Sequence, residues 1–370
     1  MAQRETEHLS RMKKCIALVL RRPLILLLLS GCLAWSQAKQ EHPPIIDMHL
    51  HAPNVAEFGA GVGPTPRMCS TNEGTVWFGW DQRKPFKVKD ASSCAGTMIP
   101  GAKTDEDLMR QTFAALERYN IRAVTSSGTE GDLEEVSKWR AASPDRIIPA
   151  ASFLRPGPEP RSRRVLRELA ELRRLVSEGQ IAVFAEVAPQ YDGMSPADPA
   201  LERYFALAEE LDIPVGIHMG EGPPGGPNVE GYSAYRVRMG NPLLLEDVLI
   251  RHPKLRLYVM HYGSPFVDDM IALLYSYPQV YVDVAGDDWE SPRKQFHSQL
   301  RRLVEAGFGK RILFGSDQMI WPDTIHLAIE TIESAGFLSE EQKRDIFYNN
   351  AARFLRLDER GHPQNKLPDK

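Results

Sequence analysis

A regular alternation of short apolar runs and amphipathic stretches covers most of this chain and limits what it can fold into. The apolar runs are nearly continuous, which is typical of parallel strands buried on both faces. The stretches between them have the spacing of helices that pack on such a sheet. We predict eight strands, at residues 45–51, 121–124, 147–153, 182–187, 214–218, 255–260, 280–284 and 312–314.

Helices are predicted after these strands, at residues 106–119, 133–141, 161–177, 199–211, 242–251, 266–275, 293–306, 324–335 and 340–355. Eight strand–helix units in one chain favour a (β/α)8 TIM barrel of the α/β class over an open, doubly wound sheet. The first strand is not followed by a glycine-rich phosphate-binding sequence, which argues against a dinucleotide-binding fold. We predict one barrel domain over residues 39–357, followed by a polar tail over 358–370.

A long segment without clear periodicity, residues 53–104, separates the first strand from the first helix. Connections of this length usually form lids or binding loops. Its aromatic residues either line a pocket or form a small core of their own. The segment also holds Cys69 and Cys94, which we expect to form a disulfide in an exported protein; the alternative is two unrelated thiols.

The N-terminal residues 1–38 have the composition of a signal peptide. Basic residues precede the apolar run Leu24–Leu29, and small residues follow it. This run is shorter than the ~20 residues that span a bilayer. The sequence Leu29–Cys32 resembles a lipobox, so the signal can end before Cys32, which would carry a lipid; Ser36–Ala38 resembles an ordinary cleavage site instead. We predict export, to the bacterial periplasm or as a membrane-anchored lipoprotein, with an uncleaved anchor as a third alternative.

The charge of the chain narrows the classes of partner. A net charge of -4 over 370 residues gives no electrostatic reason to expect nucleic acid. We predict a small-molecule substrate, contact with a membrane only through the N-terminal anchor, and leave open a homo-oligomer.

Residues that can bind a metal stand at the ends of the predicted strands. His49 and His51 project from the same face of the first strand, because alternate residues of a strand share a face. Later strands end in the remaining members of the set: Glu186, His218, His261 and Asp317. Taken singly, each of these residues could be a histidine packed in the core, an acid in an ion pair or an acid that caps a helix. Together they lie where barrel enzymes have their active sites, and a divalent cation would compensate their burial.

The order His-x-His, acid, His, His, Asp resembles the amidohydrolase superfamily, particularly its amidohydrolase-related branch. The resemblance runs from Asp47–His51 through Phe314–Asp317 to Asn350–Leu355. It implies that one metal is held by His49, His51 and Asp317, that Glu186 bridges two metals, and that the second is held by His218 and His261. In mononuclear relatives the residue at His261 contacts the attacking water instead, so the number of metals stays open.

Histidine and carboxylate ligands suit one or two Zn2+ ions, and Mn2+ or Fe2+ also fit. Zinc lowers the pKa of its water to ~7. We predict a metal-dependent hydrolase that acts on an amide, lactone or ester carbonyl, with Asp317 as proton shuttle and His261 as a second catalytic residue. The alternatives are a decarboxylase resembling aminocarboxymuconate-semialdehyde decarboxylase, a metal-free lactonase and a non-catalytic binding lipoprotein.

Substrate-binding residues are predicted from two loops that follow strands. Tyr232 and Arg236 follow the fifth strand, and Trp321 follows Asp317. An arginine there could bind a carboxylate through two hydrogen bonds, and an aromatic ring could stack on the substrate. Ordinary surface arginines and packed aromatics are the alternatives. The acids Asp287, Asp288 and Glu290 are predicted to form a solvated or helix-capping cluster.

Overall fold

The computed structural model describes residues 42–58, 67–69, 74–127, 133–157, 164–229, 231–358, 361 and 363. The chain divides into two compact units, residues 1–42 and 43–370. The description below concerns the second unit. The predicted signal peptide, residues 1–38, and most of the predicted tail, residues 358–370, lie outside the described residues.

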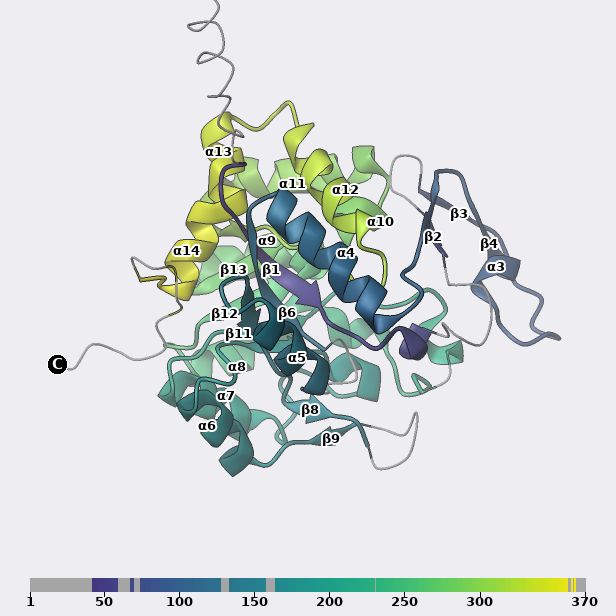
Figure 1. Ribbon diagram of the computed structural model, residues 1–370. Helices are drawn as coiled ribbons and strands as arrows, with labels where there is room; N and C mark the ends of the chain where they lie inside the picture. The colour runs from purple at the N-terminus through teal and green to yellow at the C-terminus, as the bar shows by residue number, and fades with distance from the viewer. Residues whose placement is uncertain are drawn as a thin grey trace, which may run out of the picture. The chain divides into compact units, whose positions relative to one another are not determined.

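Two parallel sheets form the centre of this unit (Figure 1). The three-stranded sheet has the order β1-β6-β7, and the five-stranded sheet has the order β10-β11-β12-β13-β14. The strand bounds are β1 Ile45–His51, β6 Ile121–Ser126, β7 Ile147–Pro149, β10 Phe184–Val187, β11 Val215–His218, β12 Leu257–Met260, β13 Val280–Asp283 and β14 Ile312–Leu313. Strands neighbour one another in chain order, as the predicted strand–helix alternation requires.

Backbone contacts connect the two sheets on both sides. Beyond β7, Ala150 forms a parallel bridge with Val183, which precedes β10. On the other side, Leu50 of β1 forms a parallel bridge with Gln318, which follows β14. The N–H of Met48 also donates to the carbonyl of Phe314 at 2.9 Å. The α/β class and the parallel strands are therefore as predicted.

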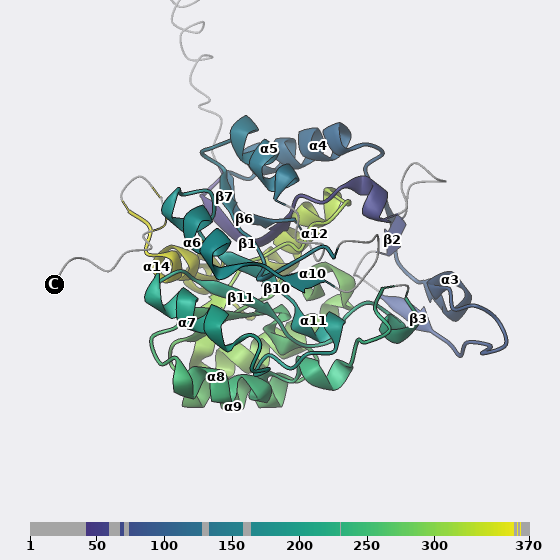
Figure 2. The same cartoon turned by 90° about the horizontal axis from the view of Figure 1, so that it is seen from below.

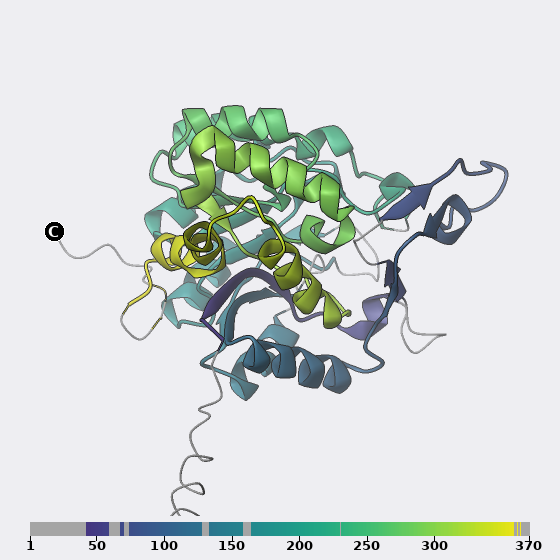
Figure 3. The same cartoon turned by 90° about the horizontal axis from the view of Figure 1, so that it is seen from above.

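Helices lie outside the strands, as Figures 2 and 3 show. The helix bounds are α4 Asp105–Arg118, α5 Glu134–Ala142, α6 Leu169–Ser177, α7 Glu202–Glu210, α8 Glu246–Arg251, α9 Val267–Ser276, α10 Asp287–Glu290, α11 Arg293–Leu303, α12 Asp323–Glu333, α13 Glu340–Arg344 and α14 Asn350–Leu355. Side chains cap the N-termini of two of these helices: Thr104 accepts from the N–H of Asp107 at the start of α4, and Ser339 forms a capping box with Gln342 at the start of α13. Within the described ranges, no helix has the length and apolar character needed to cross a membrane.

The ends of the strands remote from the predicted metal ligands are filled by a small apolar core. Met48, Tyr258 and Leu313 pack there with Phe354 of α14. The hydroxyl of Tyr258 donates to the carbonyl of Met48 at 3.0 Å. Gly216 makes room for this ring, because a β-carbon at that position would lie 2.3 Å from Cζ of Tyr258. The space between the strands is thus closed at this end by packed side chains.

One predicted helix is shorter than expected. Within the predicted range 161–177, α6 begins only at Leu169, and Val165–Leu166 forms strand β9, which pairs with β8, Leu154–Arg155. Contacts of Arg164 and the pairing of β9 accompany the difference: the guanidinium of Arg164 donates to Asp192 at 2.7 Å, and its backbone N–H donates to the same carboxylate at 3.3 Å. Residues 158–163 lie outside the described part.

The segment between β1 and α4 contains a 3-10 helix at Val55–Phe58 and a group of short elements that we call the arm, residues 67–69 and 74–100. In the arm, β2, Arg67–Cys69, pairs antiparallel with β5, Met98–Pro100. Likewise β3, Thr75–Trp77, pairs with β4, Ser92–Cys94, and α3 spans Val88–Ala91.

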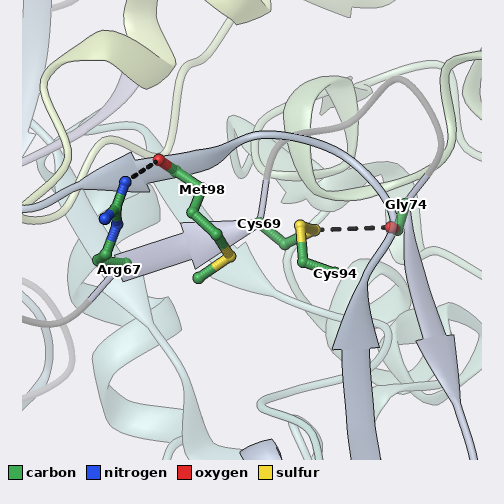
Figure 4. Close-up of a disulfide and its surroundings, with 5 residues drawn as sticks. All are labelled: Arg67, Cys69, Gly74, Cys94 and Met98. Carbon is green, nitrogen blue, oxygen red and sulfur yellow. Dashed lines mark hydrogen bonds between the residues drawn. A yellow bond between two sulfur atoms is a disulfide. The ribbon is translucent and has the colours of Figure 1, made fainter.

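A disulfide joins the two pairs of strands of the arm, as predicted. Cys69 of β2 and Cys94 of β4 are bonded, with their Cα atoms 5.5 Å apart (Figure 4). The same figure shows Arg67, whose guanidinium donates to the carbonyl of Met98 at 2.9 Å across the β2–β5 pair. The arm is therefore held by a covalent cross-link in addition to short strand pairing.

Candidate metal centre

The predicted ligands from β1 and from the residues after β14 converge in the structure. Nε2 of His49 lies 3.1 Å from Nε2 of His51. Oδ1 of Asp317 lies 3.0 Å from Nε2 of His51 and 3.5 Å from Nε2 of His49. Separations of about 3 Å are what ligand atoms have when each is ~2.1 Å from one shared ion. We call these three residues the first donor group.

The other predicted ligands form a second donor group. Nδ1 of His218 lies 2.5 Å from Oε1 of Glu186 and 3.0 Å from Nε2 of His261. Nε2 of His261 lies 3.9 Å from the same glutamate oxygen. These residues lie at the C-terminal ends of three strands of the five-stranded sheet: Glu186 is the penultimate residue of β10, His218 ends β11, and His261 directly follows β12.

Glu186 lies between the two donor groups. While its Oε1 atom faces His218, its Oε2 atom lies 3.6 Å from Nε2 of His51 and 3.8 Å from Nε2 of His49. The carboxylate thus presents one oxygen to each group. This is the arrangement expected of a carboxylate shared by two cations.

The outward hydrogen bonds of the histidines fix which ring nitrogens face inward without a proton. His261 donates from Nδ1 to the carbonyl of Ala285 at 2.9 Å, and His218 donates from Nε2 to the carbonyl of Glu221 at 3.0 Å. His49 donates from Nδ1 to Asp283 at 3.2 Å. When these rings are neutral, the opposite nitrogens carry the lone pairs that a cation would bind, and when the rings are protonated the same nitrogens donate to the carboxylates that they face.

His51 is compatible with the same pattern, because its Nδ1 atom lies 2.9 Å from the hydroxyl oxygen of Ser126. Four imidazoles and two carboxylates that all present lone pairs to a small buried space repel one another unless positive charge lies between them. The residues present therefore fit one or two divalent cations. Metal-binding histidines commonly donate their other ring N–H in this way.

The electrostatic environment also favours positive charge. Burial lowers the pKa of His261, but Glu186 and Asp317 outweigh it and raise that pKa to about 9. Burial raises the pKa of Glu186, but hydrogen bonds with His218 and His261 outweigh it and bring it well below the usual range. The same balance, with His49 and His51 as the causes, lowers the pKa of Asp317. The carboxylates are therefore ionised and can bind a cation.

Two ligand positions have an unusual backbone. His261 has a φ of 56° and Asp317 a φ of 45°, in the left-handed region that residues with a β-carbon rarely adopt. The N–H of Asp317 donates to the carbonyl of His49 at 2.7 Å, and the N–H of His261 donates to Asp283 at 2.8 Å. These contacts hold strained conformations of the kind that concentrate at functional sites.

Asp283 is a site residue that the sequence analysis missed. It is fully buried at the end of β13, and it bonds both the ring of His49 and the backbone N–H of His261, one residue from each donor group. The signal was present, because Asp283 interrupts an apolar strand, as Glu186 does. Ser126, at the end of β6, was missed as well and carries a weaker signal.

The predicted substrate-binding residues lie at different distances from the centre. The ring of Tyr232 lies 5.0 Å from that of Tyr191, which in turn lies 5.1 Å from the ring of His218. Trp321 is buried and packs edge-on against Phe58 at 5.6 Å. Arg236 is exposed, and its guanidinium donates to the backbone carbonyls of Ser233 and Tyr235. The contacts of these side chains connect Tyr232 most directly with the centre.

The prediction of a solvated or helix-capping acidic cluster after β13 is wrong for two of its members, which are buried and do not cap α10. Asp287 is buried and accepts from the hydroxyls of Ser264 and Ser291 at 3.0 and 2.9 Å. Asp288 is also fully buried, and burial, with the charge of Asp47, raises its pKa well above the usual range. The short helix α10 turns these side chains inward, which charge pattern alone does not indicate.

Two further acids lie near the second donor group. Desolvation, with the charge of Asp287, raises the pKa of Glu221 to about 7. Glu290 is exposed as a residue, but desolvation at its carboxylate, with the charges of Asp317 and Asp287, raises its pKa to about 8. Carboxylates that raise one another's pKa values lie close together, and values of about 7 and 8 mean that both acids take up protons near neutral pH.

Comparison with known proteins agrees with this geometry. The family model described as amidohydrolase matches residues 46–357, which include every predicted ligand. The chain belongs to the amidohydrolase family. The match begins inside β1 and ends after α14, so it covers the strands and helices described above.

Solved structures show the same fold at low sequence identity. An uncharacterized TIM-barrel protein from Bordetella bronchiseptica has a TM-score of 0.52 and 19% identity, over 70% of this chain and 86% of its own. A probable 2-pyrone-4,6-dicarboxylic acid hydrolase from Acinetobacter baumannii has a TM-score of 0.52 and 13% identity, over 84% and 99%. A 2,6-dihydroxybenzoate decarboxylase has a TM-score of 0.50 and 13% identity, over 85% and 98%. A search among curated proteins found no match to this chain.

Proposed function

We propose that this amidohydrolase is a metal-dependent hydrolase of a small molecule, with two divalent cations, most simply Zn2+, and Mn2+ or Fe2+ as alternatives. The observation that carries the proposal is the position of Glu186, with one carboxylate oxygen toward each donor group. His49, His51 and Asp317 would hold one cation, His218 and His261 the other. When bound, such cations polarise a carbonyl group and acidify water.

The chain's own groups supply the proton transfers and the positioning. Asp317 is ionised in its surroundings, so its carboxylate can accept the proton of the attacking water and deliver it to the leaving group. Its side chain is 14% exposed, the largest exposure among the residues of the first donor group. Asp317 is therefore the member of that group that a substrate can reach. His261, 12% exposed, borders the same space.

Decarboxylation is the second candidate, because a dihydroxybenzoate decarboxylase shares the fold. The acids Glu221, Asp287 and Glu290 offer no positive charge to a substrate that presents a second anionic group on this side. The nearby cation Arg164 is already bound to Asp192 at 2.7 Å. Hydrolysis of a neutral amide, lactone or ester is therefore the better supported reaction.

The eight parallel strands are further proposed to close into a (β/α)8 barrel. The bridges Ala150–Val183 and Leu50–Gln318 support closure, because they connect the three-stranded and five-stranded sheets on both sides. In a closed barrel all strand ends face one space, which accounts for the convergence of ligands from β1, β10, β11 and β12. The segment 53–104, which contains the arm, is then an insertion after the first strand.

Export remains part of the proposal. The Cys69–Cys94 disulfide supports it, because such bonds persist mainly in oxidising compartments. A periplasmic protein, soluble or lipid-anchored at Cys32, with a small-molecule substrate and no nucleic-acid partner, is the form that we propose. Mass spectrometry of the mature N-terminus distinguishes a lipidated Cys32 from cleavage after Ala38.

A product assay tests the reaction. The protein with added Zn2+ is incubated with a panel of anilides, aryl esters and lactones, and with benzoates as decarboxylase substrates. We expect a new carboxyl group from the first set, and no release of CO2 from the second. Release of CO2 without hydrolysis would show that the protein is a decarboxylase and contradict the proposed hydrolase. Activity that persists after removal of the metal would contradict both metal-dependent reactions.

A further inference from the structure

A cavity of about 420 Å3 lies between the arm and the loop that follows β11. Figures 2 and 3 both show β3 of the arm next to this loop. The argument uses six of the side chains that line the cavity: Trp77, Glu221, Pro223, Pro224, Pro227 and Tyr235.

The cavity lies beside the second donor group, because its lining residue Glu221 contacts His218 and its lining residue Tyr235 packs near Tyr191, which packs near His218. The carbonyl of Glu221, whose side chain lines the cavity, accepts from the ring of His218 at 3.0 Å. The ring of Tyr191 lies 5.1 Å from that of His218 and 5.7 Å from that of Tyr235. A substrate whose reacting bond lies at the metal centre can therefore extend its remaining part into this cavity.

Close packing of the loop after β11 against Tyr235 and Phe86 fixes the shape of the cavity. The hydroxyl of Tyr235 accepts from the N–H of Gly222 at 2.8 Å, and a β-carbon on Gly222 would lie 2.7 Å from its ring. Gly225 has a φ of 69°, and a β-carbon there would lie 2.2 Å from Cζ of Phe86 in the arm. The loop therefore packs closely on Tyr235 and Phe86, and the arm forms one wall of a preformed site.

The chemistry of the walls is apolar and aromatic with one acid. Trp77 is 54% exposed, which leaves much of a large ring for a ligand to cover. Glu221 is the acidic side chain among the described lining residues, and none of these is a lysine or an arginine. Asp287 acts on Glu221 as a like charge, and an ammonium group bound beside Glu221 would favour the ionised form of its carboxylate. Aromatic faces beside a carboxylate attract cations and hydrogen-bond donors and disfavour anions.

We propose that this cavity binds the non-reacting part of the substrate and selects an aromatic or apolar group that carries a positive charge. Trp77 and Tyr235 contact the ring of that group, and Glu221 pairs with its amine. The inference rests on the proposed function, since it names the substrate class of the same site. It assigns Trp77 and Glu221 as specificity-determining residues, rather than the exposed Arg236.

Binding of three compounds with the same ring tests the proposal without requiring turnover. Isothermal titration of the metal-loaded protein compares 2-naphthylmethylamine, 2-naphthylmethanol and 2-naphthalenesulfonate. We expect the amine to bind at least about tenfold more tightly than the sulfonate, with the alcohol between them. Glu221→Gln should remove most of the amine's advantage over the alcohol, because it removes the charge and keeps the shape.

Two variants of the arm provide the matched comparison. Trp77→Ala should weaken the amine and the alcohol alike by about tenfold, because both lose the aromatic wall. Phe78→Ala is the control, since Phe78 is 50% exposed, follows Trp77 directly and does not line the cavity. It should leave all three affinities unchanged.

Equal affinities for amine and sulfonate, or equal losses in Trp77→Ala and Phe78→Ala, would overturn the assignment of the cavity. These results are separable from those of the product assay. A protein that hydrolyses its substrates but lacks this binding pattern refutes the cavity alone. A protein that shows the binding pattern but no hydrolysis refutes the proposed reaction alone.

Discussion

The metal centre and the arm differ in what holds them in place. At the centre, ligands stand at the ends of parallel strands, with the side chains of His49 and Glu186 only 1% and 5% exposed. In the arm the paired strands are three residues long, and Trp77 and Phe78 are half exposed. The centre is fixed by the main hydrophobic core, whereas the arm is fixed by a disulfide and a few contacts with a neighbouring loop.

This difference separates two tasks. Chemistry with metal ions needs donor atoms held to a fraction of an ångström, which strand ends in a packed core provide. Selection of a substrate needs a surface that can differ between related enzymes. An exposed segment between two secondary-structure elements, such as the arm, provides such a surface. Changes at the centre should therefore alter metal content and rate together, and changes in the arm should alter affinity and leave the metal in place.

Removal of a ligand should have the largest effect. His49→Ala removes a donor of the first group and should weaken metal binding by more than about 100-fold. Turnover should fall below detection, because Glu186 faces both donor groups, so that loss of a cation from the first group also disturbs the second. Metal analysis of the purified variant is the measurement. His326→Ala, an exposed histidine on α12, should keep the wild-type metal content; an unchanged content in His49→Ala would exclude that residue from the centre.

Asp317→Asn should affect rate more than metal. The amide keeps an oxygen that can face the cation but cannot accept a proton, so we expect kcat to fall by about 10²–10⁴-fold with metal retained. The measurement is kcat together with metal content of the same preparation. A variant with wild-type kcat would refute the proton-shuttle role.

Asp283→Asn should have an intermediate effect. The variant weakens the hydrogen bond that orients His49 without touching a ligand atom, so metal affinity should fall by about 10–100-fold. Competition with a chelator measures this affinity. Asp268→Asn, on the exposed face of α9, is the matched control and should have no effect. Equal affinities in both variants would show that Asp283 does not support the centre.

Loss of the disulfide should have the smallest effect on the centre. Cys69 and Cys94 are 25 residues apart, and closing a loop of that size contributes about 3.5 kcal/mol in the chain-entropy model, here to the arm. In Cys69→Ser/Cys94→Ser, we expect faster proteolysis within the arm and an unchanged metal content. Loss of metal in this variant would show that the arm and the centre are one cooperative unit, contrary to the comparison above.

The sequence was sufficient to predict that these side chains come together, because the C-terminal part of an apolar strand is a local feature: His49 and Glu186 lie near the ends of β1 and β10, and Asp317 follows β14. It did not reveal Asp283, whose role depends on a contact with His49 across 234 positions. Nor did it indicate that Asp287 and Asp288 turn inward, or that Arg164 pairs with Asp192 and α6 begins only at Leu169. These features depend on which loops meet in space, and local periodicity contains no such information.

The central claim is a pair of divalent cations bridged by Glu186, and metal stoichiometry tests it most directly. The protein is purified without chelator, dialysed against Zn2+ and analysed for bound metal per chain. We expect about two equivalents in the wild type and a loss of at least one in Glu186→Gln, because a neutral amide bridges cations poorly. One equivalent in the wild type would contradict the bridging role of Glu186. None, with no activity on adding metal, would contradict the metal centre itself.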